Sequence, residues 1–299
     1  MAHSTRHLAV PSVLLSLLAC SDASATFVGD RYFISTLVTV VPTPADFANV
    51  PHFVMLPETA GTREADFLFT WSKLITKDWS LFATETFRIL DEPNVDTRTG
   101  FENLTLGTQY QAYTNEEHQF VVTVGGTASI EDTGTPGIAA EFSTVTPTIY
   151  WGKGFGDLPD SLAWLQPVTI TGNLSVTLPL EDTTFTDGTE VTNPDILNWS
   201  FALEYTLLDT VHTNGRRFPV GVVPLVEFAF TTPLDGPDAG ETTGTINPGI
   251  IWVQEEFQFG LEAIIPVNEA SDGLGFRAQF HWYFANIFPD SFLGKPIFD

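Results

Sequence analysis

The stretch GFRAQFHWYF, residues 275–284, places Arg277, Gln279 and His281 at every second position. In an extended strand these three side chains share one face, while aromatic residues and one alanine occupy the other. A guanidinium, an amide and an imidazole on one face can pair with carboxylates or hydrogen-bond a polar solute. Their role depends on which face is inside. In a water-soluble sheet the polar row meets solvent, whereas in a membrane barrel it lines the interior.

Three glutamates stand in the polar phase of other alternating segments. Glu204 lies in 197–206, Glu227 in 222–231 and Glu262 in 257–265, each opposite a row of apolar side chains. Inside a barrel such carboxylates must be paired or hydrated, because an isolated buried charge is costly. Two roles stay open: a bias of the pore toward cations and polar solutes, and a structural Glu–Arg network that braces the wall. The predicted lumen and transport residues are Glu204, Glu227, Glu262, Arg277, Gln279 and His281, with Asn198, Gln109 and Gln111 beside them.

No constellation in the sequence predicts catalysis. His281 is the only histidine well inside a predicted strand, no Gly-x-Ser-x-Gly occurs, and no serine stands in an evident pairing with that histidine. HExxH is absent, and the acidic stretch EDTTFTDGTE (181–190) lacks EF-hand spacing. We therefore predict a protein that is not an enzyme, with no catalytic residue, no metal site and no cofactor.

Composition leaves two classes of fold. The chain has 299 residues, a formal net charge of -25, 25 phenylalanines and a single cysteine. So acidic a surface argues against nucleic acid as a partner. No run of about 18 apolar residues follows residue 25, so the sequence predicts no transmembrane helix. A mean hydropathy of +0.10 with abundant Thr, Gly and Pro is typical of a soluble β-sandwich or a membrane β-barrel.

The N-terminus resembles an export signal. Arg6 and His7 precede the apolar run LAVPSVLLSLLA, and Ala23-Ser24-Ala25 is a small-x-small cleavage site. These features predict a secretory signal peptide over 1–25. The alternative is a lipobox at Leu17-Leu18-Ala19-Cys20, which would make Cys20 a lipidated first residue. Cleavage after Ala25 would leave a mature chain without cysteine, and therefore without disulfides.

Beyond the signal, alternating segments recur between turn residues. The predicted strands are 30–42, 65–75, 79–90, 100–113, 118–131, 141–153, 165–179, 196–208, 219–232, 243–253, 256–267 and 273–286, about twelve in all. Segments of this length suit a tilted membrane strand better than a sandwich strand. In 79–90 Glu85 falls in the apolar phase, so we expect either a bulge or a different register there.

Connections, charges and aromatic residues all favour the barrel. Short and long connections alternate, acidic residues gather in the long ones, and Lys73, Lys77 and Lys153 stand near the short ones. Aromatic residues expected in interfacial girdles stand near strand ends: Trp71, Trp79, Tyr110, Tyr150, Trp151, Tyr205 and Trp252. The predicted fold is an all-β, transmembrane, antiparallel up-and-down β-barrel of about twelve strands.

Several stretches resemble a known family. YWGKGFGDLPDSLAWLQP (150–167), PLVEFAF (224–230), TTGTINPGIIW (242–252) and FGLEAIIPVN (259–268) are similar to bacterial outer-membrane transporters named for the "MetA-pathway of phenol degradation". The resemblance covers essentially the whole mature chain and implies passage of small, hydrophobic or aromatic molecules. It supplies no catalytic residues. It departs from the usual barrel terminus, because Phe298 is followed by Asp299 and the closing β-signal is better assigned to 275–284.

The sequence therefore predicts three parts and one principal function. Residues 1–25 are the signal peptide, 26–288 the outer-membrane β-barrel and 289–299 a C-terminal periplasmic tail that tucks into the barrel mouth. The expected function is passive diffusion of small solutes through the bacterial outer membrane, with outer-membrane lipid, lipopolysaccharide and the barrel-assembly machinery as partners. The alternative is a structural or interaction barrel with a closed lumen and acidic external loops.

Overall fold

The computed structural model describes residues 27–186, 189–213, 216–267 and 273–298. The predictions for 1–25, including the signal peptide and Cys20, lie outside these residues. No helix in the described ranges has the length and apolar character needed to cross a membrane.

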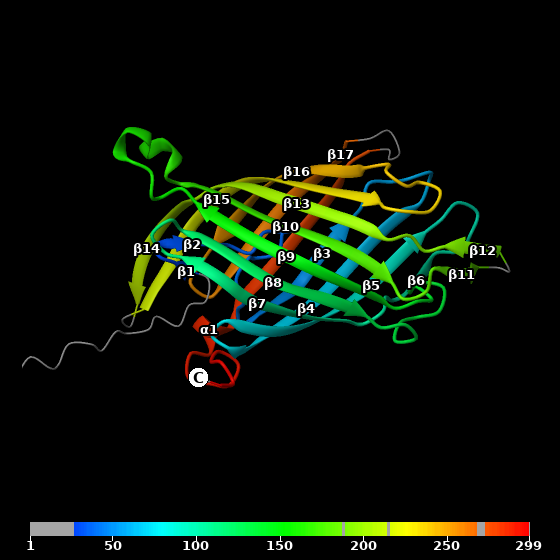
Figure 1. The fold of residues 1–299 in the computed structure, drawn as a ribbon, viewed down its shortest axis with the longest axis horizontal. Coiled ribbons are helices and arrows are strands. Elements are labelled where there is room, and N and C mark those ends of the chain that lie inside the picture. Colours follow the sequence, from blue (N-terminus) through cyan, green and yellow to red (C-terminus); the bar gives the residue numbers. More distant parts are fainter. Residues whose placement is uncertain (1–26, 187–188, 214–215, 268–272, 299) are drawn as a thin grey trace, which may run out of the picture.

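A closed antiparallel barrel of twelve strands confirms the predicted fold class (Figure 1). The wall strands are β3 (Phe47–Met55), β4 (Arg63–Thr76), β5 (Trp79–Asp91), β7 (Thr105–Asn115), β8 (Phe120–Ser129), β9 (Thr144–Gly154), β10 (Val168–Pro179), β13 (Ile196–Tyr205), β15 (Arg216–Pro233), β16 (Thr243–Val253), β17 (Phe257–Pro266) and β18 (Gly275–Tyr283). Each strand pairs with its neighbours along the chain, and β18 pairs with β3 to close the ring. Closure leaves the wall without a free edge, as a membrane barrel requires.

Shorter elements extend the wall at both ends. β14 (Leu207–Thr213) lengthens the hairpin that joins β13 to β15, and β6 (Arg98–Phe101) pairs with β5. The pair β11 (Thr183–Thr186) and β12 (Thr189–Thr192) lies within the connection from β10 to β13. We call the end with the short turns the turn end and the opposite end the loop end. The helix α1 (Phe284–Ile287) follows β18 at the turn end.

The prediction of a strand over 30–42 is wrong. After the small hairpin of β1 (Phe27–Val28) and β2 (Arg31–Tyr32), the chain has no regular structure until β3 begins at Phe47. The first wall strand is thus 47–55, and residues 31–46 lie inside the barrel. The predicted number of twelve strands is confirmed, although the first wall strand is 47–55 and not 30–42.

The outer face carries the aromatic rows that the sequence predicted. Trp71 is 48% exposed and Tyr110 53% exposed, and ring pairs such as Trp199–Phe230, with centroids 4.1 Å apart, cover adjacent strands. Tyr150 is the exception: it is only 4% exposed and lines an internal cavity, so its assignment to the girdle is wrong. Its neighbour Trp151 takes the outward position in β9.

Glu85 lies on the outer face without any bulge in its own strand. The register of β5 against β4 runs unbroken from Trp79 to Asp91 except beside Ile75 in β4, and Glu85 pairs with the outward Phe69. Neither the bulge nor the different register expected for 79–90 is therefore present. One carboxylate oxygen of Glu85 is buried and has no hydrogen-bond partner. We have no physical account of a carboxylate at this position.

The turn between β9 and β10 is ordered but does not cap the barrel. It holds the short helix η1 (Asp160–Leu165), and Trp164 is 66% exposed, so this turn does not form an apolar lid over the turn end. Burial would raise the pKa of the Asp157 carboxyl, but hydrogen bonds from Lys153 and His118 hold that pKa below its usual value.

The C-terminal tail packs beside the wall, which corrects the expectation that it enters the mouth. The backbone N–H groups of Ile297 and Phe298 donate to the carbonyls of Leu74 and Ile75 at the turn end of β4. Lys73 Nζ donates to the carbonyl of Lys295 over 2.6 Å and to Asp46 Oδ1 over 2.6 Å. The tail thus holds Lys73 against the residue that immediately precedes β3.

Asp46 joins three segments at the turn end. Its Oδ1 accepts from Lys73 and from the N–H of Leu74, and its backbone carbonyl accepts from the N–H of Phe284. Burial raises the pKa of the Asp46 carboxyl, although the hydrogen bond from Lys73 opposes this. This residue fixes where the internal segment leaves the lumen and the wall begins.

We expect Asp46→Ala to lower the free energy of unfolding by about 2–4 kcal/mol, because it leaves the buried Lys73 ammonium without its carboxylate. The measurement is urea unfolding of the barrel in detergent or lipid. The matched control is Asp290→Ala, which removes the ion pair between Asp290 and Lys295. The Asp290 side chain is 95% exposed. That change should cost less than about 1 kcal/mol. Equal losses for both variants would contradict the role given to Asp46.

Candidate functional site

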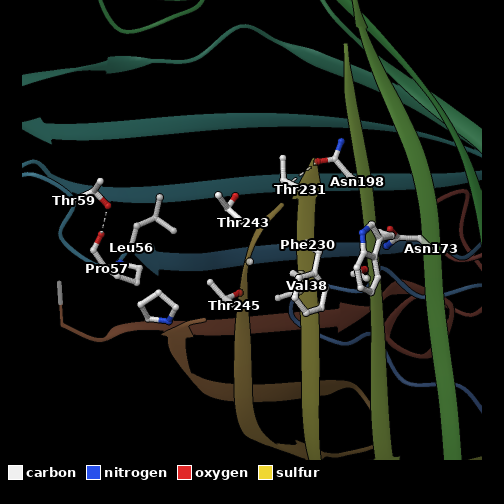
Figure 2. A pocket seen from close by; sticks show the side chains of 15 residues that line it. Val38, Leu56, Pro57, Thr59, Asn173, Asn198, Phe230, Thr231, Thr243 and Thr245 are labelled. Atoms are coloured by element: carbon white, nitrogen blue, oxygen red, sulfur yellow. Dashed lines mark hydrogen bonds between the residues drawn. The ribbon is translucent and has the colours of Figure 1, made fainter. Parts of the chain in front are cut away.

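The lumen is hollow at the loop end. A cavity of about 640 Å³, which we call the vestibule, opens between β10, β13, β15 and β16 on one side and the β3–β4 connection on the other (Figure 2). Its wall carries Thr and Asn side chains, including Asn173, Asn198 and Thr231. Val38, from the segment inside the barrel, also lines it.

A second cavity lies on the other side of that segment. The inner cavity has a volume of about 340 Å³ and is lined by residues 35–38 and 40 together with side chains of seven wall strands. Phe82, Leu68 and Val54 give it apolar walls, and Gln109 and Gln279 add amides. Val38 lines both cavities, so the lumen is divided at this residue.

The dividing segment is a plug formed by residues 31–46. It starts at the turn end, where Arg31 donates to the Gln119 side chain and to the carbonyl of Gln166. It reaches the middle of the lumen at 37–39 and returns to Asp46. All of its residues are buried except Val38, Val40 and Ala45. The first twenty described residues therefore fill the interior instead of adding a strand.

One carboxylate receives the tip of the plug. The backbone N–H groups of Leu37, Val38 and Thr39 point at Glu227, with N–O distances of 2.9 Å, 3.0 Å and 2.7 Å. Three successive N–H groups converging on an anion form a nest, and hydrogen bonds to an ionised acceptor are stronger than neutral ones. Glu227 is fully buried. The carboxylate thus replaces the secondary structure that would otherwise satisfy these donors.

Wall side chains satisfy the plug's carbonyl groups. Thr123 Oγ1 donates to the carbonyl of Pro42 over 2.5 Å, and Gln109 Nε2 donates to that of Val41 over 3.3 Å. Gln258 donates to the carbonyl of Ser35 and accepts from the Tyr283 hydroxyl. Irregular backbone is tolerated at membrane depth only when it is satisfied in this way.

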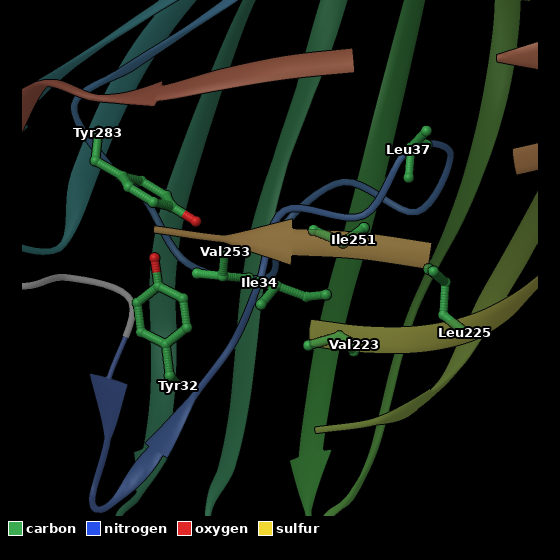
Figure 3. Packing of buried hydrophobic residues seen from close by; sticks show 8 residues of the cluster. All are labelled: Tyr32, Ile34, Leu37, Val223, Leu225, Ile251, Val253 and Tyr283. Carbon is green, nitrogen blue, oxygen red and sulfur yellow. The ribbon is translucent and has the colours of Figure 1, made fainter. Parts of the chain in front are cut away.

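Apolar contacts complete the seat of the plug. Ile34 and Leu37 of the plug pack on a patch from β15 and β16, and Tyr32 meets Tyr283 edge to face with centroids 6.2 Å apart (Figure 3). The patch consists of Val223, Leu225, Ile251 and Val253, all buried and all pointing into the lumen. Apolar side chains in the inward phase are exceptional for a water-filled pore, and here they cover the plug.

The three predicted lumen glutamates all lie inside the barrel and are buried. Glu204 accepts from Thr171 over 2.9 Å, and Glu262 pairs with Arg277 across β17 and β18. Glu262 is 5% exposed and Glu204 1% exposed, so no open water path passes them. Among the described residues, Glu262 alone of the three forms an ion pair with an arginine, whereas Glu204 bonds a threonine and Glu227 bonds the plug.

Gln279 and His281 also face inward but engage the wall. His281 Nδ1 lies 2.7 Å from Asn49 Oδ1, and its ring stacks on Phe47 with centroids 4.6 Å apart. Gln279 Nε2 lies 3.3 Å from Nδ1 of His52. Both therefore fix the seam where β18 meets β3. Among the flanking candidates, Gln109 holds the plug, Asn198 lines the vestibule, and Gln111 bonds Thr114 at the turn end.

The sequence analysis did not predict a cluster of ion pairs around Arg88. Arg88 reaches Asp66, Glu64 and Glu102 over 2.9 Å, 2.8 Å and 2.5 Å, near the loop end of β4 and β5. The signal was available, because Arg88 stands in the inward phase of β5 and Asp66 in that of β4. Within the described ranges, no three His, Cys, Asp or Glu residues are placed to hold a metal ion.

Comparison with known proteins supports the fold. No family model and no curated protein sequence matches the chain. Among solved structures, the COG4313 outer membrane channel from Pseudomonas putida F1 aligns with a TM-score of 0.58 at 8% identity, over 80% of this chain and 96% of that one. The KdgM porin aligns with a TM-score of 0.49 at 8% identity, over 80% of this chain and 99% of that one. At such identities the similarity concerns the barrel fold alone.

We expect Glu227→Gln to loosen the tip of the plug, because a neutral amide holds three converging N–H groups less strongly than a carboxylate. A hydrogen bond to a charged group contributes roughly 1.5–3 kcal/mol, so amide exchange at Leu37, Val38 and Thr39 should accelerate at least about tenfold. Hydrogen–deuterium exchange of the peptide spanning 33–46 measures this. Glu204→Gln is the control, since its carboxylate hydrogen-bonds Thr171 and not the N–H groups at the tip of the plug. Unchanged exchange in Glu227→Gln would contradict the nest.

Proposed function

We propose that the protein is an outer-membrane channel that passes small, amphipathic solutes by passive diffusion once its plug is displaced. A closed twelve-stranded barrel with a cavity on each side of an internal segment supports this proposal. The vestibule and the inner cavity fall within the roughly 300–1,000 Å³ range of small-molecule sites. A barrel built only as a scaffold has no need for two such volumes.

The plug makes the described arrangement a closed state. Val38 separates the two cavities, and the apolar patch of β15 and β16 covers the lower lumen. Because the plug precedes the first wall strand and pairs with none of them, it can move without opening the barrel. Displacement of residues 33–40 would join the cavities and expose Glu204, Glu227 and Glu262 to water.

The resemblance of 150–167 and 242–252 to the phenol-degradation transporter family also supports small solutes that carry a hydrophobic or aromatic group. The apolar walls of the inner cavity, with Phe82, Leu68 and Val54, suit a hydrophobic or aromatic group. In an opened lumen three glutamates would face Arg31 and Arg277, and this excess of carboxylates would disfavour anions. On the basis of the closed barrel and the family resemblance, we also propose that the protein resides in the outer membrane, with lipopolysaccharide and the barrel-assembly machinery as partners.

The buried glutamates favour one alternative, a structural or interaction barrel with a permanently closed lumen. Removing the plug separates the two functions. We expect deletion of 27–44 to raise single-channel conductance in planar bilayers at least severalfold, because the deleted residues fill the cross-section that ions would use. The full chain should show small or rare openings.

The control for this experiment is deletion of 289–298, which removes a segment outside the lumen. Its conductance should match that of the full chain, provided that heat-modifiable gel mobility shows a folded barrel. If neither the full chain nor the plug-deleted chain conducts although both are folded, the channel function is wrong and the structural barrel remains.

A further inference from the structure

The vestibule has two chemically different walls. On one side, four adjacent strands bring neutral side chains into register, all of them polar except that of Ala229: Asn173 pairs with Ser200, Ser200 with Ala229, and Ala229 with Thr245. One layer nearer the loop end, Asn198, Thr231 and Thr243 repeat the arrangement. Opposite these strands stand Leu56, Pro57 and Thr59 of the β3–β4 connection, and Val38 of the plug also lines the cavity. The strand wall thus carries most of the hydrogen-bonding side chains, whereas Leu56, Pro57 and Val38 supply apolar surface.

None of the fifteen residues that line the vestibule is charged. This is unexpected in a chain with a formal net charge of -25. The buried carboxylate of Glu227, on the same strand as the lining residues Ala229 and Thr231, is already occupied by three N–H groups of the plug. The described lining therefore offers neither a cation to hold an anion nor a free carboxylate to hold an ammonium group.

Polar groups here are left over for a ligand. Thr231 and Asn198 bond each other, whereas Asn173, Thr243 and Thr245 have no side-chain partner among the described residues. Asn247, the next inward residue after Thr245 on β16, is fully buried, and neither its amide oxygen nor its amide nitrogen has a partner. Asn247 does not line the vestibule, so the polar groups open to a ligand are those of Asn173, Thr243 and Thr245.

We propose that the vestibule binds an uncharged, amphipathic molecule that carries hydroxyl or carbonyl groups along one edge and a hydrocarbon or ring surface along the other. The polar edge lies on Asn173 and Thr245 of the strand wall, and the apolar surface lies on Leu56, Pro57 and Val38. Anionic and cationic analogues of the same size are excluded, because burying either charge without a partner is unfavourable. This inference rests on the proposed function, since it names the solute class that enters from the loop end.

Binding of three probes with one ring tests the proposal: benzyl alcohol, benzoate and benzylammonium. Ligand-observed NMR titrations use the detergent-solubilised full chain. We expect benzyl alcohol to bind at least about tenfold more tightly than either ion, because only the neutral probe avoids an unpaired charge. The double variant Asn173→Leu with Thr245→Val should weaken benzyl alcohol about two- to tenfold for each hydrogen bond lost.

Two matched variants control for changes in the barrel. Thr127→Val removes the hydroxyl of a threonine that lines the inner cavity, and should leave the affinity for benzyl alcohol within twofold. Thr245→Ser keeps the hydroxyl and should also retain binding. The proposal is overturned if either ion binds as tightly as the alcohol, if benzyl alcohol does not bind, or if the double variant binds it unchanged.

Failure of this site and failure of the channel function give different results. Binding is measured without a membrane, so a neutral preference that depends on Asn173 and Thr245 stands even if the plug-deleted chain does not conduct. Conduction by that chain together with binding that ignores these two residues would overturn the vestibule site alone.

Discussion

The contact between the Glu227 carboxylate and three backbone N–H groups sets the arrangement of the whole interior. An irregular segment placed inside a barrel brings donors that no sheet ladder can satisfy, and each one left unpaired would cost more than a kilocalorie. Glu227 satisfies the N–H groups of Leu37, Val38 and Thr39 at the deepest point of the plug. The carbonyl groups on either side are met by Thr123, Gln109 and Gln258.

No single contact could hold the plug, because ordering a chain costs about 1–2 kcal/mol per residue. Burial of the plug's apolar side chains on the patch of β15 and β16 offsets this entropic cost. Glycines in the wall leave the space that these side chains need. A Cβ added to Gly152 would lie 2.6 Å from the ring of Phe33, and one added to Gly260 would lie 2.8 Å from Leu37. The same wall thus recognises the plug by hydrogen bonds, by apolar burial and by absent side chains. Because these contacts hold the plug across the lumen, Val38 separates the two cavities.

The alternation of polar and apolar residues correctly predicted most of the wall strands, because each strand meets lipid on one face and the lumen on the other. The two faces of 275–284 and 222–231 differ in contact with lipid, so Phe276 and Phe228 face out while Arg277 and Glu227 face in. The same rule failed for 30–42, where Val38, Val40 and the residues around them alternate loosely although they contact no lipid. Tyr150 was misplaced for a related reason, since an aromatic residue near a strand end can serve a girdle or an internal cavity.

The plug itself could have been inferred from the wall strands. Val222 with Val223 and Ile250 with Ile251 are apolar in both phases, which a water-filled barrel does not require, and Gly152 and Gly260 fall in the inward phase. Which segment covers that patch depends on three-dimensional proximity that sequence spacing does not encode. The same is true of the tail that reaches Lys73.

Cross-linking between the plug and the wall measures the central claim most directly. Thr39 Oγ1 lies 3.2 Å from Ser200 Oγ, so Thr39→Cys with Ser200→Cys, in a chain whose Cys20 is replaced by serine, should form a disulfide. The account predicts near-complete oxidation in the membrane and protection of the thiol at position 39, which is fully buried, from maleimide before oxidation. Two free thiols that react rapidly with maleimide and do not cross-link would show that the segment lies outside the lumen, and would contradict the account.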